Sequence, residues 1–417
     1  MPPPTTTLPL RDSFHLPTHH GRPATYLCGN SLGPQPRATA AAVQHELDRW
    51  RELGVEGWFA ETDPWLNYHE LLQQSLGRIV GARPEETVVA NGLTINLHLL
   101  LTSFYRPEGK RRLIIHEAGA FPSDQHALAA QIKWHGLDPA TTLVPVRPRA
   151  GESALRTEDI VAAIAEAGDE LALVLFAGVH YYTGQFFDLP AITRAGRAAG
   201  AVVGLDLAHA VGNVPLQLHD WGVDFAVWCN YKYLNGGPGA PGGLFVHERH
   251  AYRPELPRLA GWWGHEESTR FLMRPEFDPA RGAAGWQVST PPIILLAALR
   301  ASLDLFDRAG MDELRRRSLQ LTGLLYGGLE KMMATGADLR LLTPADPASR
   351  GAQVSIFFGE NGRAVFDRLS AAGIIADWRE DNLGGTRGGV IRVAPAPLYT
   401  SEEEVMRLLE VLEDAVN

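Results

Sequence analysis

Cysteine is nearly absent from this chain. Only Cys28 and Cys229 occur among its 417 residues. Two cysteines cannot build a disulfide framework or a four-ligand zinc site, so a reducing, cytoplasmic compartment is expected. Long apolar runs are missing as well, because no stretch approaches the roughly 18 apolar residues that span a bilayer. Residues 1–7 have neither a basic segment nor an apolar core, so we expect no signal peptide and no membrane partner.

Clustered positive charge is also scarce. The net charge is -10, and the only short basic runs are residues 110–112 and 315–317. Binding to nucleic acid requires clustered Lys and Arg to neutralise phosphates, so a nucleic-acid partner is not expected. The runs are interpreted as solvated faces.

Several catalytic motifs are absent too. No G-x-x-x-x-G-K-[ST] occurs, which argues against a P-loop nucleotide enzyme. The His-Glu pairs at 116–117 and 265–266 lack the second histidine of H-E-x-x-H, so no metal is expected. The glycines of 237–242 spell G-x-G-x-x-G, but this segment contains two prolines and leads into a strand rather than a helix.

The pattern of apolar residues predicts an α/β fold. Short β-branched runs alternate with segments of helical period, which is typical of a mostly parallel sheet covered by helices on both faces. The predicted strands are 87–89, 113–116, 143–146, 171–176, 202–206, 225–228 and 243–246, and the helices between them are 94–104, 122–135, 157–167 and 190–200.

The two ends of the chain lack the regular alternation of strands and helices seen in the middle. Helices are predicted at 36–53 and 66–79, and a long helix near 311–333 precedes strands near 352–358, 374–378 and 389–394 and helices at 361–371 and 401–415. We therefore predict a large domain over 51–309 and a smaller α+β domain over 310–417. The N-terminal segment, 1–50, is expected to pack on the small domain.

Lys232 and Asp206 form the most informative pair. Lys232 lies between two tyrosines in a Gly- and Pro-rich loop, and Asp206 ends an apolar strand 26 residues earlier. A lysine amine can form a Schiff base with pyridoxal phosphate (PLP), and a carboxylate can keep the ring nitrogen protonated. An isolated Asp at a strand end is otherwise a helix N-cap, and an isolated Lys a surface charge. His209 could stack on the ring or have a structural role.

Two helix starts could bind the rest of such a cofactor. Thr94 opens a helix after the predicted strand 87–89, where backbone N–H groups can bind a phosphate; a Thr N-cap is the alternative. Phe121 and Asp124 open another helix. Phe121 could stack on the ring and Asp124 could add negative charge, or they are a core residue and a first-turn acid.

Together these segments resemble the kynureninase family through nearly the whole chain. The resemblance is carried by residues 26–33, 93–98, 121–124, 178–185, 206–213, 230–239, 261–266 and 391–399. It implies a fold-type-I PLP enzyme of the aspartate aminotransferase superfamily. Such an enzyme hydrolyses L-kynurenine, or 3-hydroxy-L-kynurenine, to anthranilate or 3-hydroxyanthranilate and L-alanine in tryptophan catabolism.

The resemblance also implies roles for individual residues. Lys232, Tyr231 and Asp206 would be catalytic, and Arg392, Asn30 and Ser31 would bind the substrate. The cofactor would contact Leu93, Thr94, Phe121, Pro122, Ser123, Asp124, Ala177, Asp206, His209, Tyr231, Lys232, Trp262 and Thr290. Trp262 and Thr290 would come from the neighbouring subunit of a homodimer with active sites at the subunit interface.

Two positions and the poorly aligned segment 54–58 depart from the family, and three rival functions stay open. Ala177 stands where a hydroxyl residue is common, and Thr290 where Asn is frequent.

An aminotransferase and a cysteine desulfurase-like lyase share the fold, but a desulfurase needs a reactive cysteine well after the lysine. Both cysteines here precede Lys232. A cofactor-binding regulator without turnover is the third rival.

Overall fold

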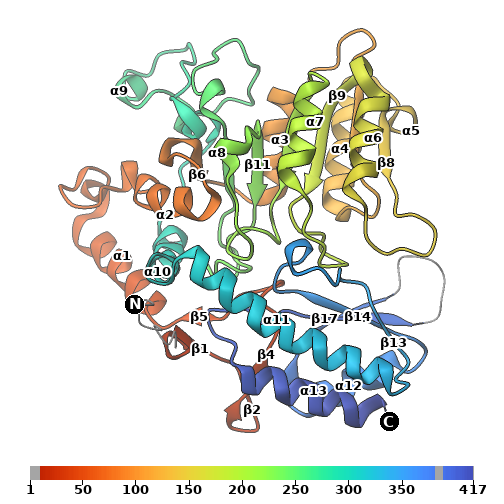
Figure 1. The fold of residues 1–417 in the computed structure, drawn as a ribbon. Helices are drawn as coiled ribbons and strands as arrows, with labels where there is room; N and C mark the ends of the chain where they lie inside the picture. Colours follow the sequence, from red (N-terminus) through yellow and green to blue (C-terminus); the bar gives the residue numbers. More distant parts are fainter. Residues whose placement is uncertain (1–9, 381–387, 417) are drawn as a thin grey trace, which may run out of the picture.

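The computed structural model describes residues 10–380 and 388–416. Residues 1–7, for which no signal peptide was predicted, lie outside this range. Figure 1 shows a large sheet flanked by helices and a smaller sheet beside α11 and α13, with α10 leading from one region to the other. Within the described residues, no helix is long and apolar enough to cross a membrane.

The large sheet has seven strands, and all seven were predicted. Their spatial order is β6 (Thr87–Val89), β12 (Gly243–Val246), β11 (Phe225–Trp228), β10 (Val202–Asp206), β9 (Leu171–Ala177), β7 (Leu113–Glu117) and β8 (Leu143–Val146). The five strands from β11 to β8 are parallel, whereas β12 is antiparallel to both its neighbours. The prediction of a mostly parallel sheet is confirmed.

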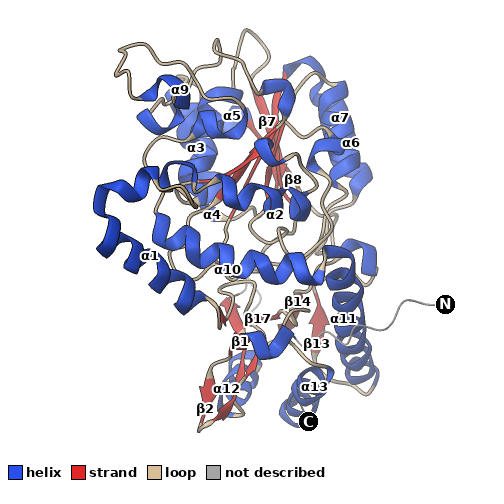
Figure 2. Cartoon of the chain, turned by 90° about the vertical axis from the view of Figure 1, so that its left-hand side faces the viewer, coloured by secondary structure: helices blue, strands red, loops and turns tan. Residues whose placement is uncertain are grey.

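Alternate side chains of these strands enter two different cores, because successive residues of a strand point to opposite faces. Ile114 and Leu173 pack with α3 (Leu93–Phe104) and α4 (Pro122–Trp134). Their neighbours Ile115 and Val174 pack on the other face, with α2 (Glu70–Val80), α6 (Thr157–Ala167) and α7 (Leu189–Ala198). Figure 2 shows helices on both sides of the strands. The strands are therefore buried on both faces, and polar side chains gather at their ends.

The smaller sheet is wholly antiparallel. Its order is β13 (Leu339–Leu341), β14 (Val354–Phe358), β17 (Gly389–Val393) and β16 (Asp377–Glu380). Its core includes Ile356, Ile391, Leu321 of α11 (Met311–Ala334) and Leu408 of α13 (Glu402–Val416), and α12 (Gly362–Ala371) packs beside it. The strand predicted near 374–378 is split in two: β15 (Ile374–Ile375) pairs with β4 (Thr25–Tyr26) outside this sheet, and β16 begins at Asp377.

The N-terminal segment contacts both regions. Leu27 packs into the core of the smaller sheet, while α1 (Thr39–Leu53) contacts α10 (Ile293–Ala309). α10 was not predicted, and the helix predicted from 36 begins at Thr39 because Pro36 lies in β5 (Gln35–Pro36). The remaining elements are β1 (Phe14–His15), β2 (Thr18–His19), β3 (Arg22–Pro23), α5 (Pro139–Thr142), α8 (Leu218–Trp221) and α9 (Glu267–Arg270).

Candidate active site

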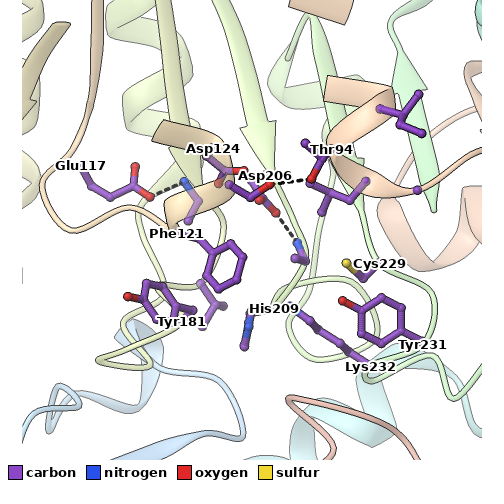
Figure 3. A pocket seen from close by; sticks show the side chains of 17 residues that line it. Thr94, Glu117, Phe121, Asp124, Tyr181, Asp206, His209, Cys229, Tyr231 and Lys232 are labelled. Atoms are coloured by element: carbon purple, nitrogen blue, oxygen red, sulfur yellow. Dashed lines mark hydrogen bonds between the residues drawn. The ribbon is translucent and has the colours of Figure 1, made fainter. Parts of the chain in front are cut away.

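A cavity of about 320 Å³ lies at the carboxyl ends of β7, β9, β10 and β11, the edge where ligands bind in open α/β sheets (Figure 3). Ten predicted site residues line it: Leu93, Thr94, Phe121, Ser123, Asp124, Ala177, Asp206, His209, Tyr231 and Lys232. The structure thus brings together residues that are up to 139 positions apart, because parallel strands end at the same edge.

Asp206 is the last residue of β10 and is 7% exposed. Its Oδ1 accepts a hydrogen bond from the backbone N–H of Ala208 at 2.7 Å, as an N-cap would, but a turn rather than a helix follows. Its own carbonyl accepts from Gly178 N at 2.7 Å. Asp206 is therefore a fixed carboxylate in the cavity wall and not a helix cap.

Two further buried acids lie in the same wall. Glu117 ends β7, and Asp124 lies in the first turn of α4; both are at most 4% exposed. Burial raises the pKa of Glu117 to about 8. Burial, and then the neighbouring Asp206, raises the pKa of Asp124 well above its ordinary value. Three acids in one poorly solvated place favour a cationic ligand group beside them.

Lys232 is the one lysine in the cavity. The chain has four lysines, and the other three, Lys110, Lys133 and Lys331, are exposed. The Nζ of Lys232 lies 5.9 Å from the ring centroid of Phe121 and 5.9 Å from that of Tyr231. The surface alternative for Lys232 is therefore wrong.

Buried contacts hold the loop that carries Lys232. Asn230 is fully buried, accepts from Trp228 Nε1 at 2.8 Å and donates to the carbonyl of Pro241 at 2.7 Å. Gly33 N donates to the carbonyl of Tyr231 at 2.9 Å. A Cβ on Gly33 would lie 2.4 Å from the carbonyl oxygen of Lys232, so only glycine allows this approach. The N-terminal segment thereby helps to fix the lysine loop.

The starts of α3 and α4 supply polar donors. Gly92 is the N-cap of α3 and offers no side-chain cap, so the first backbone N–H groups of this helix have no side-chain acceptor at the cap. Thr94 is thus a first-turn residue rather than the N-cap, and its Oγ1 lies 2.6 Å from Ser123 Oγ. Two hydroxyls and a 12-residue helix N-terminus form a place suited to an anion.

Aromatic and neutral groups complete the cavity. The ring of Phe121 is 45% exposed, and its centroid is 5.2 Å from that of Tyr181, nearly perpendicular to it. His209 is buried, and burial, followed by the charge of Lys232, lowers its pKa well below the ordinary value. The imidazole is therefore neutral near pH 7 and can stack or hydrogen-bond without adding charge.

Sequence reasoning missed three chemically important lining residues. Glu117, Tyr181 and Cys229 all line the cavity. Glu117 ends β7 and Cys229 directly follows β11, and that position was the available signal; Tyr181 lies in the loop after β9. Glu117 Oε1 accepts from the N–H of Ala177 at 3.2 Å, which ties the ends of β7 and β9 together.

Six predicted residues lie outside this cavity. Pro122 is the first residue of α4, and Trp262 is 45% exposed and donates from Nε1 to the carbonyl of Arg270 at 3.2 Å. Ser31 and Thr290 line an adjoining cavity of about 640 Å³ that Tyr231 also borders. The other two are buried: Asn30 donates to Gln353 Oε1 at 3.0 Å, and Arg392, in β17 of the smaller sheet, pairs with Asp377.

One possible metal cluster exists among the described residues. Glu86, His219 and His247 lie close together, away from the cavity. The carboxylate of Glu86 already accepts from the N–H groups of Arg83 and Glu248, at 2.8 and 2.7 Å, and contacts His219 Nδ1 at 2.9 Å. These contacts give Glu86 a structural role.

Known structures define the class of this fold. The chain superimposes on a cysteine desulfurase from Thermococcus onnurineus NA1 with a TM-score of 0.77 at 18% identity, covering 94% of both chains. It also superimposes on a C-DES mutant with glycine covalently linked to its PLP cofactor, with a TM-score of 0.78 at 21% identity, covering 94% of this chain and 96% of that chain. The fold is that of the fold-type-I PLP-dependent enzymes, as predicted.

Sequence comparison identifies the family. The model of the kynureninase C-terminal domain matches residues 314–412. Kynureninases from Xanthomonas campestris pv. campestris (strain B100) and Stenotrophomonas maltophilia (strain K279a) are each 54% identical to the chain, covering 97% of it and 94% of each relative. One from Myxococcus xanthus is 53% identical, covering 97% of the chain and 93% of the relative. The chain belongs to the kynureninase family.

Proposed function

We propose that this protein uses PLP to hydrolyse L-kynurenine to anthranilate and L-alanine in tryptophan catabolism. 3-Hydroxy-L-kynurenine, which would give 3-hydroxyanthranilate, is a second candidate substrate. The observation that carries the proposal is the cavity in which Lys232 shares a wall with Asp206, in a chain 54% identical to kynureninases over 97% of its length.

The cavity fits this cofactor. Oδ1 of Asp124 is buried and has no hydrogen-bond partner among the described residues, although Asp206 and Glu117 lie nearby. A protonated ring nitrogen would relieve the repulsion among these acids. Thr94, Ser123 and the start of α3 would hold the phosphate, and Phe121 offers an exposed ring face for stacking.

When bound, PLP supplies an electron sink for the negative charge that develops on the substrate carbons. Lys232 would then move a proton at Nζ, acting as the general base towards the substrate Cα. Asp206 would keep the ring nitrogen protonated.

Tyr231 would stabilise the oxygen of the substrate's hydrated carbonyl group. Burial, followed by the nearby Cys229, raises the pKa of Tyr231 well above its ordinary value, so the phenol keeps its proton at neutral pH. A positioned phenol can donate a hydrogen bond to an oxygen that becomes negative. If a Tyr231→Phe variant turned over at the normal rate, this role would be restricted to binding the phosphate.

We also infer a cytoplasmic homodimer whose partner subunit donates Trp262 and Thr290. Both side chains are exposed, and Trp262 lies in an apolar patch: its ring centroid is 5.5 Å from that of Phe271, which is 5.8 Å from that of Phe59. Contiguous exposed apolar rings commonly mark protein interfaces. Within each chain, Arg392, Asn30 and Ser31 would bind the substrate. Residues 1–50, 51–309 and 310–417 would form the N-terminal segment, the large domain and the small domain.

The rival enzymes share the fold but are less well supported. A desulfurase needs a reactive thiolate, yet burial raises the pKa of Cys229 and raises that of Cys28 to about 11. An aminotransferase would use the same lysine and acids without releasing an aromatic amine.

Product analysis separates these functions. The PLP-loaded protein is incubated with L-kynurenine and with 3-hydroxy-L-kynurenine, and anthranilate, 3-hydroxyanthranilate and L-alanine are quantified. Equal amounts of the aromatic product and L-alanine are expected. Keto-acid-dependent loss of substrate without anthranilate would indicate an aminotransferase, and the absence of all three products would overturn the assignment.

A further inference from the structure

Arg392, the predicted clamp for the substrate carboxylate, lies directly behind one wall of the cavity. It is 2% exposed in β17, and its Nη1 donates to the carbonyl of Tyr181 at 2.6 Å. Tyr181 lines the cavity, and its ring centroid is 6.0 Å from Cζ of Arg392. Nε of Arg392 has no hydrogen-bond partner among the described residues, so the guanidinium keeps donor capacity for a ligand.

Asp377 holds this guanidinium through the register of the sheet. Asp377 of β16 lies directly opposite Arg392 of β17, and its Oδ2 forms an ion pair with Nη2 of Arg392. Side chains at directly opposite positions of antiparallel strands have Cβ atoms about 4.5–5.5 Å apart. The strand register therefore keeps the two Cβ atoms close together and the carboxylate within reach of the arginine.

Arg379 supplies a second cation to the same carboxylate. It lies two residues after Asp377 in β16, hence on the same face, and its Nη2 is 3.3 Å from Asp377 Oδ2. Arg379 is exposed, whereas Arg392 and Asp377 are largely buried. Two guanidinium groups and one carboxylate sum to one positive charge, which matches the single α-carboxylate of an amino-acid substrate.

Two roles for Asp377 are conceivable, and they predict opposite effects on substrate binding. A carboxylate that competed with the substrate would have to leave Arg392 on binding. A carboxylate that keeps its ion pair instead orients Arg392 and compensates part of its buried charge. We propose that Asp377 is the positioning residue of the substrate-carboxylate site, holding Arg392 in place with Arg379 as the second cation. This inference rests on the proposed function.

The direct test is the Asp377→Asn variant, which keeps the side-chain shape and removes the charge. KM for L-kynurenine should rise about tenfold or more, because a buried charge pair loses one partner, while kcat changes by less than about twofold. The matched control is Asp367→Asn, because Asp367 forms an exposed ion pair with Arg363 on α12, away from the cavity. An unchanged or lowered KM in Asp377→Asn would show that Asp377 is dispensable or competes with the substrate.

Two further measurements isolate the carboxylate. L-Alanine binding, followed by the absorption of the bound cofactor, should weaken in Asp377→Asn by the same factor as KM rises. Turnover of a kynurenine analogue without the α-carboxylate should be equal in the variant and the wild type. An equal loss with that analogue would overturn the proposal, because the effect would then not act through carboxylate binding.

A second variant covers the case in which Asp377→Asn does not fold, which thermal unfolding would reveal. Arg379→Gln leaves the Asp377–Arg392 pair intact and removes only an exposed cation. It should raise KM and the dissociation constant of L-alanine by up to about fivefold. If neither KM nor this dissociation constant changed, Arg379 would not contribute to the carboxylate site. Failure of the wild type to release anthranilate would instead refute the proposed function, and the L-alanine titration would still test the carboxylate site.

Discussion

The two sheets place their buried charges in opposite ways. At the carboxyl ends of the large sheet, Glu117, Asp124 and Asp206 gather three acids around one cavity with Lys232 as the cation that lines it. In the smaller sheet, Asp377 lies between Arg392 and Arg379, so each buried charge has an opposite charge beside it. The first cluster is strained by repulsion, whereas the second is compensated by protein groups.

This difference separates two tasks. Burial and the neighbouring Asp206 raise the pKa of Asp124, so a cationic ligand would gain most from this cluster. The pair of Asp377 and Arg392 is set by strand register, and together with Arg379 these groups carry one net positive charge. We therefore expect changes in the cavity to lower kcat and changes around Arg392 to raise KM.

The largest effect should come from Lys232→Ala. Loss of a positioned general base typically costs 10²–10⁴-fold, and this lysine would also bond the cofactor, so kcat should fall by about 10³-fold or more. Steady-state anthranilate release measures the loss. Lys133→Ala is the control, because Lys133 is exposed on α4. Substantial activity in Lys232→Ala would show that the cavity is not the catalytic site. The contrast between the two charge clusters would then be wrong.

Asp206→Asn should have the next largest effect. The amide cannot hold a proton on the ring nitrogen by charge, so kcat should fall by about 10²-fold with a much smaller change in KM. The absorption maximum of the bound cofactor should shift as well. Asp304→Asn, at an exposed position of α10, should behave like the wild type. A rise in KM alone would place Asp206 with the binding groups instead.

Arg392→Lys should show the opposite pattern, in which KM changes more than kcat. Lysine keeps the charge but lacks the planar fork that can contact Tyr181, Asp377 and a carboxylate together, so KM should rise about tenfold. Arg308→Lys is the exposed control. If kcat fell more than KM rose, the two clusters would not divide the tasks as described.

The central sheet was predictable because each strand is a short apolar run and the helices between the strands have a clear period. Asp206 was predictable because it ends such a run, and Lys232 because it lies in the Gly- and Pro-rich loop that follows one. Asp377 was missed because its partnership with Arg392 depends on strand register, which short patterns do not specify. Glu117 was missed because it faces Asp206 only once β7, β9 and β10 lie side by side.

Helix α10 was missed for a different reason. Its first half, from Ile293 to Leu299, is almost wholly apolar, so it shows no polar face from which a helical period can be read. The roles of Trp262 and Thr290 stay predictions, because they depend on a second subunit. Sequence patterns therefore predict local elements well, while contacts across strands or subunits need the assembled fold.

The smallest expected effect is a pH dependence of stability that originates in the cavity. The pKa of Glu117 is about 8 in the folded chain, against an ordinary value of 4.5, and burial is the main cause, with Asp206 adding to it. Because the folded pKa is raised, the neutral carboxyl contributes stability that is full below pH 4.5 and is lost as the pH rises through about 8. The acids facing Glu117 are Asp124 and Asp206.

Glu117→Gln tests this dependence, because the amide oxygen can still accept from Ala177 N but never ionises. In cofactor-free protein, the melting temperature of the wild type should fall more between pH 5 and pH 9 than that of Glu117→Gln, by about 2–4 °C. Glu166→Gln, at an exposed position of α6, should follow the wild type. Adding PLP should reduce the difference, because a cationic ring nitrogen beside Asp206 and Asp124 offsets the charge that Glu117 gains at high pH. Parallel pH profiles for Glu117→Gln and the wild type would show that this acid carries no buried charge, and the contrast between the two clusters would then rest on Asp124 and Asp206 alone.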